Sequence, residues 1–356
     1  MLDALRPNPE SARRRARIVP SRCPAAARPR LLRQPRLLIV GCGDVGLRAA
    51  ALLRDRCRLR ALSSSPQRFE LLRQQGLTPI AGNLDQRTSL RRLRALAPWV
   101  LHLAPPPTQG ERDPRTARLL PALGAGLSRL VYASTTGVYG DAGGARFDET
   151  RPVHPTTPRA TRRVDAEHRV RAQGRPGRHR LSAPTCALLR IPGIYALDRE
   201  GGDPRERVRR GSPVLCEAED VYTNHIHADD LARAVVAALW RGRPQRVYHV
   251  NDATELKMGD YFDRIADLCD LPRPPRLDRA GIAATVGPMT LSFMSESRRL
   301  IAERLRRELR LSLLYPTLEA GLGGNPVRSD RADRRNALRH PSAVAESSPA
   351  GPEPHS

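Results

Sequence analysis

The run Leu37-Leu38-Ile39-Val40-Gly41-Cys42-Gly43-Asp44-Val45-Gly46 carries the clearest structural signal in the chain. Its four leading apolar residues predict a parallel strand that is buried on both faces. In the G-x-G-x-x-G pattern that follows, Gly41 permits a tight turn, Gly43 leaves room for a pyrophosphate, and Gly46 lets the next helix pack closely on the strand. A strand, a glycine turn and a helix start in this order predict a dinucleotide site, with the helix N-terminus facing the phosphates. The predicted contacts are Gly41, Cys42, Gly43, Asp44, Val45 and Gly46.

The end of the second predicted strand bears on the choice of dinucleotide. Residues 57–62 read as that strand, and Ser63-Ser64-Ser65-Pro66 follows it. An NAD site usually has Asp or Glu at this point to bind the ribose 2′-hydroxyl, and this chain has neither. Ser63, Ser64 and Arg68 offer hydroxyls and a cation, which suit a 2′-phosphate. We therefore expect NADP, with NAD possible; an ordinary turn that starts a helix is the alternative interpretation of these residues.

Strands and helices alternate along the first part of the chain. Further strands are predicted at 77–81, 99–104 and 129–134, and helices at 69–76, 87–96 and 116–123. This alternation predicts an α/β fold, a Rossmann doubly wound parallel sheet with a smaller C-terminal α/β substrate lobe. In the second part we expect a loop over 141–158, strands at 187–191 and 247–250, and helices at 159–172, 230–240, 258–268 and 295–309.

These patterns suggest four segments. We expect a disordered basic N-terminal extension over 1–35 and an NAD(P)-binding Rossmann domain over 36–185. Residues 186–323 would supply the remaining strands and the substrate-binding lobe. The tail, 324–356, is rich in Ser, Pro and charged residues, a composition typical of disorder.

The net charge of +24 raises nucleic acid as a partner, but the distribution of charge argues against it. The basic residues are arginines spread over every segment, Lys257 is the only lysine, and aromatic residues make up only 4% of the chain. Nucleic-acid sites usually need a basic stripe or a recognised module. We therefore predict a small-molecule substrate and no nucleic-acid partner.

Cysteine usage and hydropathy indicate a cytoplasmic protein. The six cysteines are widely spaced and form no C-x-x-C pair, so the sequence predicts neither a zinc site nor a disulfide framework. No apolar run reaches about 18 residues, and we predict no membrane span. His225, His227, Asp229 and Asp230 lack a tight metal-ligand spacing, and we interpret the carboxylates as helix caps, with no metal.

Several ordered stretches resemble the extended short-chain dehydrogenase/reductase family, the NAD-dependent epimerase/dehydratases. Besides the glycine turn, they are Gly82-Asn83-Leu84-Asp85, His102-Leu103-Ala104, Ser134-Thr135-Thr136-Gly137-Val138-Tyr139-Gly140, Asp148-Glu149-Thr150-Arg151-Pro152, Leu189-Arg190-Ile191-Pro192-Gly193-Ile194-Tyr195 and His227-Ala228-Asp229-Asp230-Leu231-Ala232. The resemblance covers residues 36–322. The G-x-G-x-x-G register differs from the G-x-x-G-x-x-G of typical extended members, which indicates an atypical branch.

The resemblance implies roles for individual residues and a homodimer. Asn83, Leu84 and Asp85 would lie against the adenine. Leu103 and Ala104 would lie near the inner ribose, and Pro192 and Gly193 beside the nicotinamide. Thr135 would hydrogen-bond the reacting substrate oxygen; a strand-end hydroxyl that caps its own turn is the alternative.

The family's catalytic Tyr-x-x-x-Lys pair is missing from the matching helix. Arg159 occupies the tyrosine position and Arg163 the lysine position. Arg163 could still bind the ribose, but an arginine cannot serve as a proton donor and acceptor, because its pKa exceeds about 12. Three hypotheses remain: an enzyme with another acid/base, such as Tyr139, His102 or a residue of the C-terminal part; a catalytically silent NADP-binding sensor or interaction protein; or a substrate that supplies its own acid.

Overall fold

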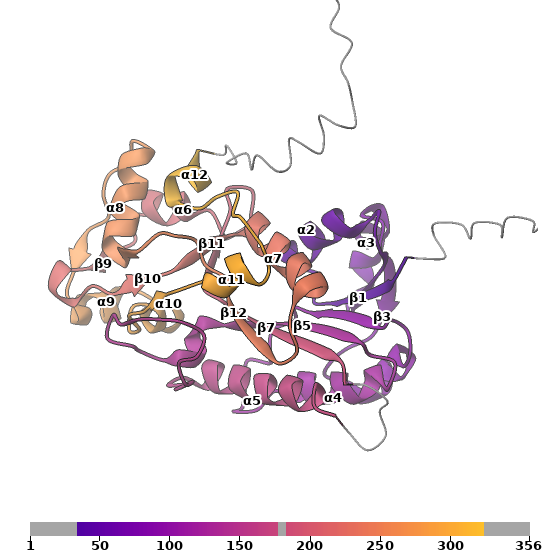
Figure 1. The fold of residues 1–356 in the computed structure, drawn as a ribbon. Coiled ribbons are helices and arrows are strands. Elements are labelled where there is room, and N and C mark those ends of the chain that lie inside the picture. Colours follow the sequence, from indigo (N-terminus) through magenta and orange to yellow (C-terminus); the bar gives the residue numbers. More distant parts are fainter. Residues whose placement is uncertain (1–33, 177–182, 324–356) are drawn as a thin grey trace, which may run out of the picture. The chain divides into compact units, whose positions relative to one another are not determined.

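The computed structural model of this protein describes residues 34–176 and 183–323. The predicted tail and nearly all of the predicted N-terminal extension lie outside these ranges. Seven parallel strands form the central sheet in the order β12-β7-β5-β4-β1-β2-β3 (Figure 1). Since β1 lies inside the sheet and the chain winds outward from it on both sides, this is a doubly wound Rossmann sheet, and the predicted fold class is confirmed. The strands are β1 (Arg36–Val40), β2 (Arg58–Ser63), β3 (Thr78–Ala81), β4 (Trp99–His102), β5 (Arg129–Thr135), β7 (Thr185–Ile191) and β12 (Arg246–His249).

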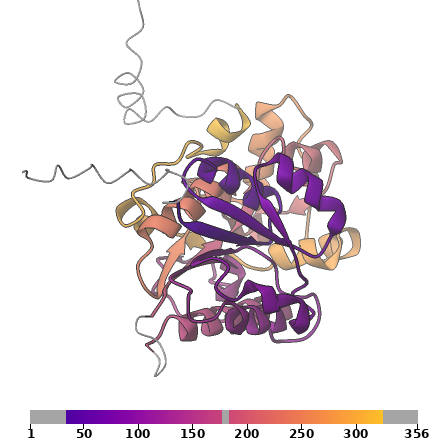
Figure 2. The ribbon, with the colours of Figure 1, turned by 90° about the vertical axis from the view of Figure 1, so that its right-hand side faces the viewer.

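Helices cover both faces of the sheet, and successive side chains of β1 are buried against opposite layers. Leu37 and Ile39 belong to a core that includes residues of α2 (Asp44–Leu53), α3 (Phe69–Gln74) and α7 (Ala228–Arg241). Leu38 and Val40 belong to the opposite core, with α4 (Pro114–Leu123) and α5 (Pro158–Gln173). The two layers can be followed on either side of the strands in Figure 1 and Figure 2. Burial on both sides therefore explains why the four residues from Leu37 to Val40 are all apolar.

The C-terminal lobe has its own apolar core. Val208 of α6 (Pro204–Arg209), Met258, Phe262 and Ile265 of α8 (Met258–Leu268) and Ile282 of α9 (Arg279–Thr285) are buried together there. The helix over 258–268 was predicted with these bounds. The remaining elements are short: β6 (Arg146–Phe147), β8 (Gly193–Tyr195), β9 (Val214–Leu215), β10 (Tyr222–Thr223), β11 (His225–His227), β13 (Leu256–Lys257), β14 (Arg276–Leu277), β15 (Arg299–Leu300), α10 (Pro288–Phe293), α11 (Glu303–Arg307) and α12 (Leu318–Leu322).

Two predicted helices are wrong in type or extent. Residues 87–93 form a 3-10 helix, in which Leu90 and Leu93, three residues apart, are both buried. The helix predicted over 295–309 is replaced by β15 and the short helix α11. Arg299 donates its backbone N–H to the Ala145 carbonyl, and the Leu300 N–H bonds to Asn224 Oδ1 at 3.1 Å. These tertiary hydrogen bonds hold the segment extended, against its helical pattern.

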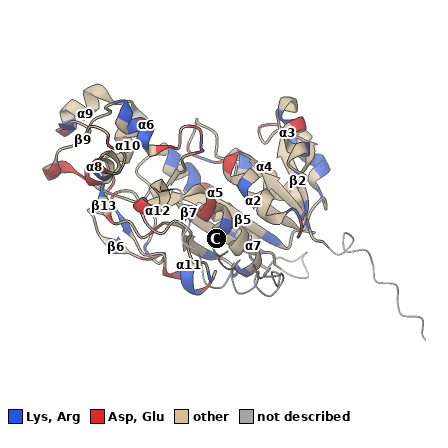
Figure 3. Cartoon of the chain, turned by 90° about the horizontal axis from the view of Figure 1, so that it is seen from above, with Lys and Arg blue, Asp and Glu red and all other residues tan. Residues whose placement is uncertain are grey.

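Charged residues are spread over the described chain. Figure 3 shows Lys and Arg on the sheet half and on the C-terminal lobe, mixed with Asp and Glu. Many of the arginines are in ion pairs, as in the contact of Arg276 with Asp263 and that of Arg246 with Glu308. None of the described helices is long and apolar enough to cross a membrane.

Candidate functional site

The three glycines of the first turn have the environments that dinucleotide binding requires. Gly41 has φ +86°, and a Cβ there would lie 2.3 Å from the Ala104 backbone nitrogen. A Cβ on Gly46 would press on the Gly41 carbonyl at 3.2 Å, where α2 meets β1. Gly43, by contrast, has an ordinary φ of −83°, and a Cβ on it would meet nothing within 4 Å. Gly41 and Gly46 are needed for packing, whereas Gly43 leaves open space beside the backbone.

The N-terminus of α2 is free to receive an anion. No side chain caps this ten-residue helix, so its first N–H groups and its positive dipole end are available. Together with the space at Gly43, this end of α2 fits the diphosphate of a nicotinamide dinucleotide. Cys42 is buried beside it, and burial raises the pKa of its thiol to about 11, so it stays a neutral thiol.

The end of β2 brings a cation to the glycine turn. Arg68 donates from Nη2 to the Cys42 carbonyl at 2.7 Å. Ser63 Oγ accepts from the Ser65 backbone at 3.2 Å, and the Ser64 side chain is exposed. The structure therefore brings the arginine, which lies 26 residues beyond Cys42 in sequence, into contact with the predicted phosphate loop.

The loops after β3 and β4 carry four of the predicted cofactor contacts. Leu103 and Ala104 donate their N–H groups to the Val40 carbonyl at 2.8 and 3.0 Å, beside Gly41. Asn83 Oδ1 accepts from the Asp85 N–H at 2.9 Å, and the Leu84 carbonyl accepts from Arg118 at 3.3 Å. All four residues thus follow parallel strands, β4 on one side of β1 and β3 beyond β2 on the other, at the same edge of the sheet as the glycine turn.

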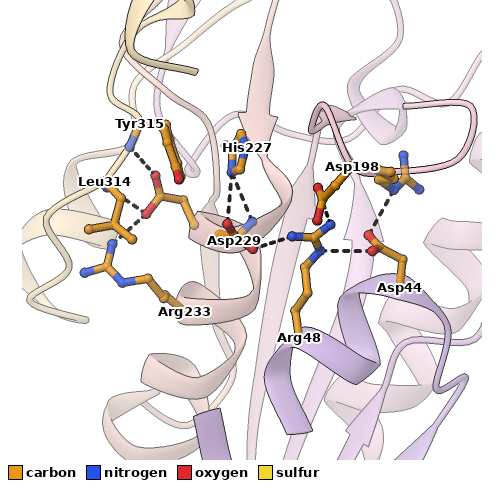
Figure 4. A network of polar contacts seen from close by, with 10 residues as sticks. Asp44, Arg48, Asp198, His227, Asp229, Arg233, Leu314 and Tyr315 are labelled. Atoms are coloured by element: carbon orange, nitrogen blue, oxygen red, sulfur yellow. Dashed lines mark hydrogen bonds and ion pairs between the residues drawn. The ribbon is translucent and has the colours of Figure 1, made fainter. Parts of the chain in front are cut away.

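A network of charges ties the first helix to the C-terminal half (Figure 4). Arg48 of α2 contacts Asp44 at 2.9 Å, Asp198 at 2.7 Å, and Asp229 at the start of α7. Arg199 reaches back to Asp44 at 3.1 Å and donates to the Ile194 carbonyl. The segment after β8 is therefore held against the glycine turn, and the predicted contact Asp44 serves as an anchor for it.

A cavity of about 350 Å³ adjoins this region. Its walls include Thr135 from the end of β5, Pro192 and Gly193 after β7, Arg159 from α5 and His225 from β11. The structure thus brings together three residues predicted to lie at the nicotinamide or the substrate. Thr135 Oγ1 accepts the Gly137 N–H at 3.3 Å, which leaves its hydroxyl hydrogen available to a ligand.

Tyr139 lies outside that cavity, in a buried polar network. His249 Nδ1 bonds the Ile301 carbonyl and must donate there, so its Nε2 accepts from the Tyr139 hydroxyl at 2.6 Å. Arg190 donates to the same hydroxyl at 2.7 Å and pairs with Glu167, which accepts from Ser134. Burial raises the pKa of Tyr139 to about 12. These contacts favour a structural role for Tyr139.

His102 and Arg163 are also engaged within the fold. His102 is buried, bonds Thr116 Oγ1 at 2.8 Å, and does not line the cavity. Arg163 donates to the Ala133 carbonyl at 2.7 Å and to the Tyr132 hydroxyl at 3.1 Å, and so links α5 to β5.

His225 is a cavity residue that the sequence offered only as a metal candidate. Its imidazole stacks on Tyr261 at 3.9 Å, and its Cδ2–Nε2 edge lies so close to Gly193 that a Cβ there would fall 3.0 Å from Cδ2. Its Nδ1 is buried, with no hydrogen-bond partner among the described residues. Burial and the nearby Arg207 lower the pKa of His225 to about 3, so the ring is neutral at pH 7. In the described ranges, no three His, Cys, Asp or Glu side chains are placed to hold a metal ion.

A doubly wound sheet with an open glycine turn and an adjoining cavity defines a dinucleotide-binding Rossmann protein. Residues 37–251 match the model of the NAD dependent epimerase/dehydratase family. The chain belongs to this family and is of its extended short-chain dehydrogenase/reductase type.

Individual relatives agree with this. A UDP-glucose 4-epimerase of Streptomyces lividans is 28% identical over 145 residues, which are 36% of this chain and 43% of that protein. The chain thus matches less than half the length of this curated relative. A functionally unknown conserved protein of Silicibacter pomeroyi is 28% identical with a TM-score of 0.67, over 82% of this chain and 98% of that one. MoeE5, solved with UDP-glucose and NAD, is 21% identical with a TM-score of 0.64, over 85% and 99% of the two chains, and shares the fold.

Proposed function

We propose that this protein is an NAD(P)-dependent oxidoreductase or epimerase that acts on a carbonyl or hydroxyl group of a nucleotide-sugar-like substrate with a non-standard acid/base. The observation that carries the proposal is the shared cavity of Thr135, Pro192, Gly193 and His225. A hydroxyl donor and an imidazole face the same space beside the residues expected at the nicotinamide. The nucleotide sugar is inferred from the relatives, among them the UDP-glucose 4-epimerase.

The cofactor would be held by the open turn at Gly43, the free N-terminus of α2, and the loops at Asn83, Leu84, Leu103 and Ala104. When bound, a nicotinamide dinucleotide supplies or accepts the hydride. We propose a preference for NADP, because Arg68 lies at the glycine turn and no carboxylate follows β2.

We propose His225 as the acid/base. As a substrate C–H gives up hydride, the hydroxyl proton passes to His225 Nε2 and a C=O forms; reduction runs in the opposite direction. Thr135 donates its free hydroxyl hydrogen to the same substrate oxygen and orients it. The ring is neutral at pH 7, but a pKa of about 3 makes it a weak base while burial and the charge of Arg207 act on it. The role therefore requires that an anionic substrate bound beside Arg207 offset this charge and raise the pKa of His225.

His225→Gln tests this assignment. Turnover of a nucleotide-sugar panel, followed by nicotinamide absorbance, should fall about 100-fold or more, with NADPH affinity unchanged. Tyr139→Phe and His102→Gln serve as comparison variants. Retention of activity in His225→Gln, with loss in either comparison variant, would contradict the assignment.

The second candidate is a catalytically silent NADP-binding sensor. The observation that favours it is Arg159, which lines the cavity at the position of the family's catalytic tyrosine. The double variant Arg159→Tyr/Arg163→Lys separates the two: activity gained only in that variant would support the silent protein.

The proposal also covers the oligomeric state and the cellular location. A homodimer that pairs through helices flanking the sheet is expected from the family resemblance, and analytical ultracentrifugation would test it. A cytoplasmic location agrees with Cys42, Cys57, Cys216 and Cys269, which are free thiols in the described chain.

A further inference from the structure

The cavity carries an excess of positive charge. Arg159, Arg199, Arg207 and Arg298 line it, and Glu296 is the acidic residue in its wall. A guanidinium in a cavity wall that has no carboxylate partner within the protein is available to bind an anionic ligand.

Two of these arginines already have carboxylate partners within the protein. Arg298 pairs with Glu296 at 2.6 Å and donates to the Gly140 carbonyl at 2.8 Å. Arg199 pairs with Asp44 at 3.1 Å. Their charges are balanced without a ligand.

Arg159 is different. It makes no hydrogen bond or ion pair with any residue of the described ranges, and its guanidinium lies 5.2 Å from the centre of the Phe293 ring. The residue is exposed at the cavity, and partial desolvation and Arg163 lower its pKa, against the opposing effect of the Glu296 charge. The N-terminus of the sixteen-residue helix α5 reaches the cavity beside it, through Thr157 and Ala160, and adds its positive dipole end.

Arg207 is the second cavity arginine that forms no ion pair with a residue of the described ranges. Its contacts are a long hydrogen bond to the Pro213 carbonyl, 3.3 Å, and the Phe262 ring at 4.5 Å. Its Nε is buried with no hydrogen-bond partner in the described chain, and burial lowers its pKa to about 10. Arg207 comes from α6 and Arg159 from α5, so the two face the cavity from different elements.

We propose that the cavity binds a ligand with two oxyanions, one at Arg207 and one at Arg159, the latter beside Thr135 at the reacting end. The forked guanidinium suits a carboxylate or a phosphate, both of which accept paired hydrogen bonds. The ligand class is a phosphate-linked hydroxy acid or sugar with a second anionic group near the reacting carbon. The placement of the second anionic group near the reacting carbon rests on the proposed function, whereas the binding of two anionic groups does not.

Three probes that share a 1-phosphate test the proposal by calorimetry: glucose 1-phosphate, glucuronic acid 1-phosphate and glucose 1,6-bisphosphate. At least one of the two probes with a second anionic group should bind about 10-fold tighter than glucose 1-phosphate. If glucuronic acid 1-phosphate binds more tightly than glucose 1,6-bisphosphate, Arg159 favours a carboxylate; if the bisphosphate binds more tightly, Arg159 favours a phosphate.

Arg159→Gln should remove that difference and leave the affinity for glucose 1-phosphate unchanged, whereas Arg159→Lys should retain part of it. Arg207→Gln should weaken all three probes about 10-fold. Arg171→Gln, about three turns further along α5, is the matched control and should change nothing. Equal affinities for the three probes, or no binding by any of them, would overturn the proposal. So would a preference for a probe with a second anionic group that persists in Arg159→Gln. An NADPH titration on the same preparations reports separately on the proposed function.

Discussion

At the scale of single residues, the end of β2 bears on the choice of dinucleotide. Residues 63–66 contain no Asp or Glu, which an NAD site usually has at this point. The only cation in contact with the Cys42 carbonyl among the described residues is Arg68, at 2.7 Å. A guanidinium there can bind a 2′-phosphate through charge-assisted hydrogen bonds.

Arg68→Ala should therefore weaken the binding of NADPH about 10- to 100-fold and change the affinity for NADH less than about 3-fold. Fluorescence titration of both nucleotides measures it. Arg73→Ala, which removes an exposed arginine paired with Glu70, is the control. Equal losses for both nucleotides would show that Arg68 supports the turn and does not select NADP.

At the scale of elements, α5 is joined to the sheet by polar contacts as well as by apolar ones. Glu167 of α5 and Arg190 of β7 are 2% and 3% exposed, and they pair through hydrogen bonds of 3.0 and 2.7 Å. The partner charges raise the pKa of Arg190. Removal of one partner leaves the other charge buried and uncompensated.

Glu167→Gln should lower the free energy of unfolding by about 3–5 kcal/mol. Urea denaturation measures this, with Glu70→Gln on α3 as the exposed control. A change below about 1 kcal/mol would mean that water reaches Arg190.

Elements with strong local patterns could be predicted from the sequence, and elements held by tertiary contacts could not. The glycine turn and α8 follow from spacing and periodicity. Residues 295–309 have a helical pattern, yet hydrogen bonds to Ala145 and Asn224 hold Arg299 and Leu300 extended. The same limit applies to the site: His225 and Arg207 reach the cavity only because β11 pairs with β8 and α6 packs against α8.

At the scale of the whole molecule, buried neutral histidines set the response to acid. His102 and His249 are 1% and 0% exposed, and burial lowers the pKa of each to about 3. In the unfolded chain the same groups titrate near 6.5. Between about pH 6.5 and pH 3 the unfolded state binds protons at these groups and the folded state does not. The free energy of unfolding therefore falls as the pH falls through this range.

From pH 7 to pH 5, these two groups and His225, whose pKa is lowered in the same way, should together lower the free energy of unfolding by about 6 kcal/mol. Urea denaturation at the two pH values measures it. His102→Gln should lose about a third of that dependence. Equal stability at both pH values would show that the imidazoles are protonated in the folded state.

The glycine turn allows folding and binding to be separated, because its glycines differ in what surrounds them. Gly41→Ala would force a Cβ against the Ala104 backbone at a φ of +86° and should cost at least about 2 kcal/mol of stability. Gly43→Ala adds a methyl group that meets no protein atom within 4 Å, so the fold should be unaffected.

NADPH titration of the native protein and of Gly43→Ala, with the melting temperature recorded for both, therefore probes whether the open turn grips a diphosphate. We predict saturable binding to the native protein, and at least about 10-fold weaker binding to a variant whose melting temperature shifts by less than about 2 °C. No saturable binding of NADPH or NADH to the native protein, or an affinity unchanged in Gly43→Ala, would contradict this account.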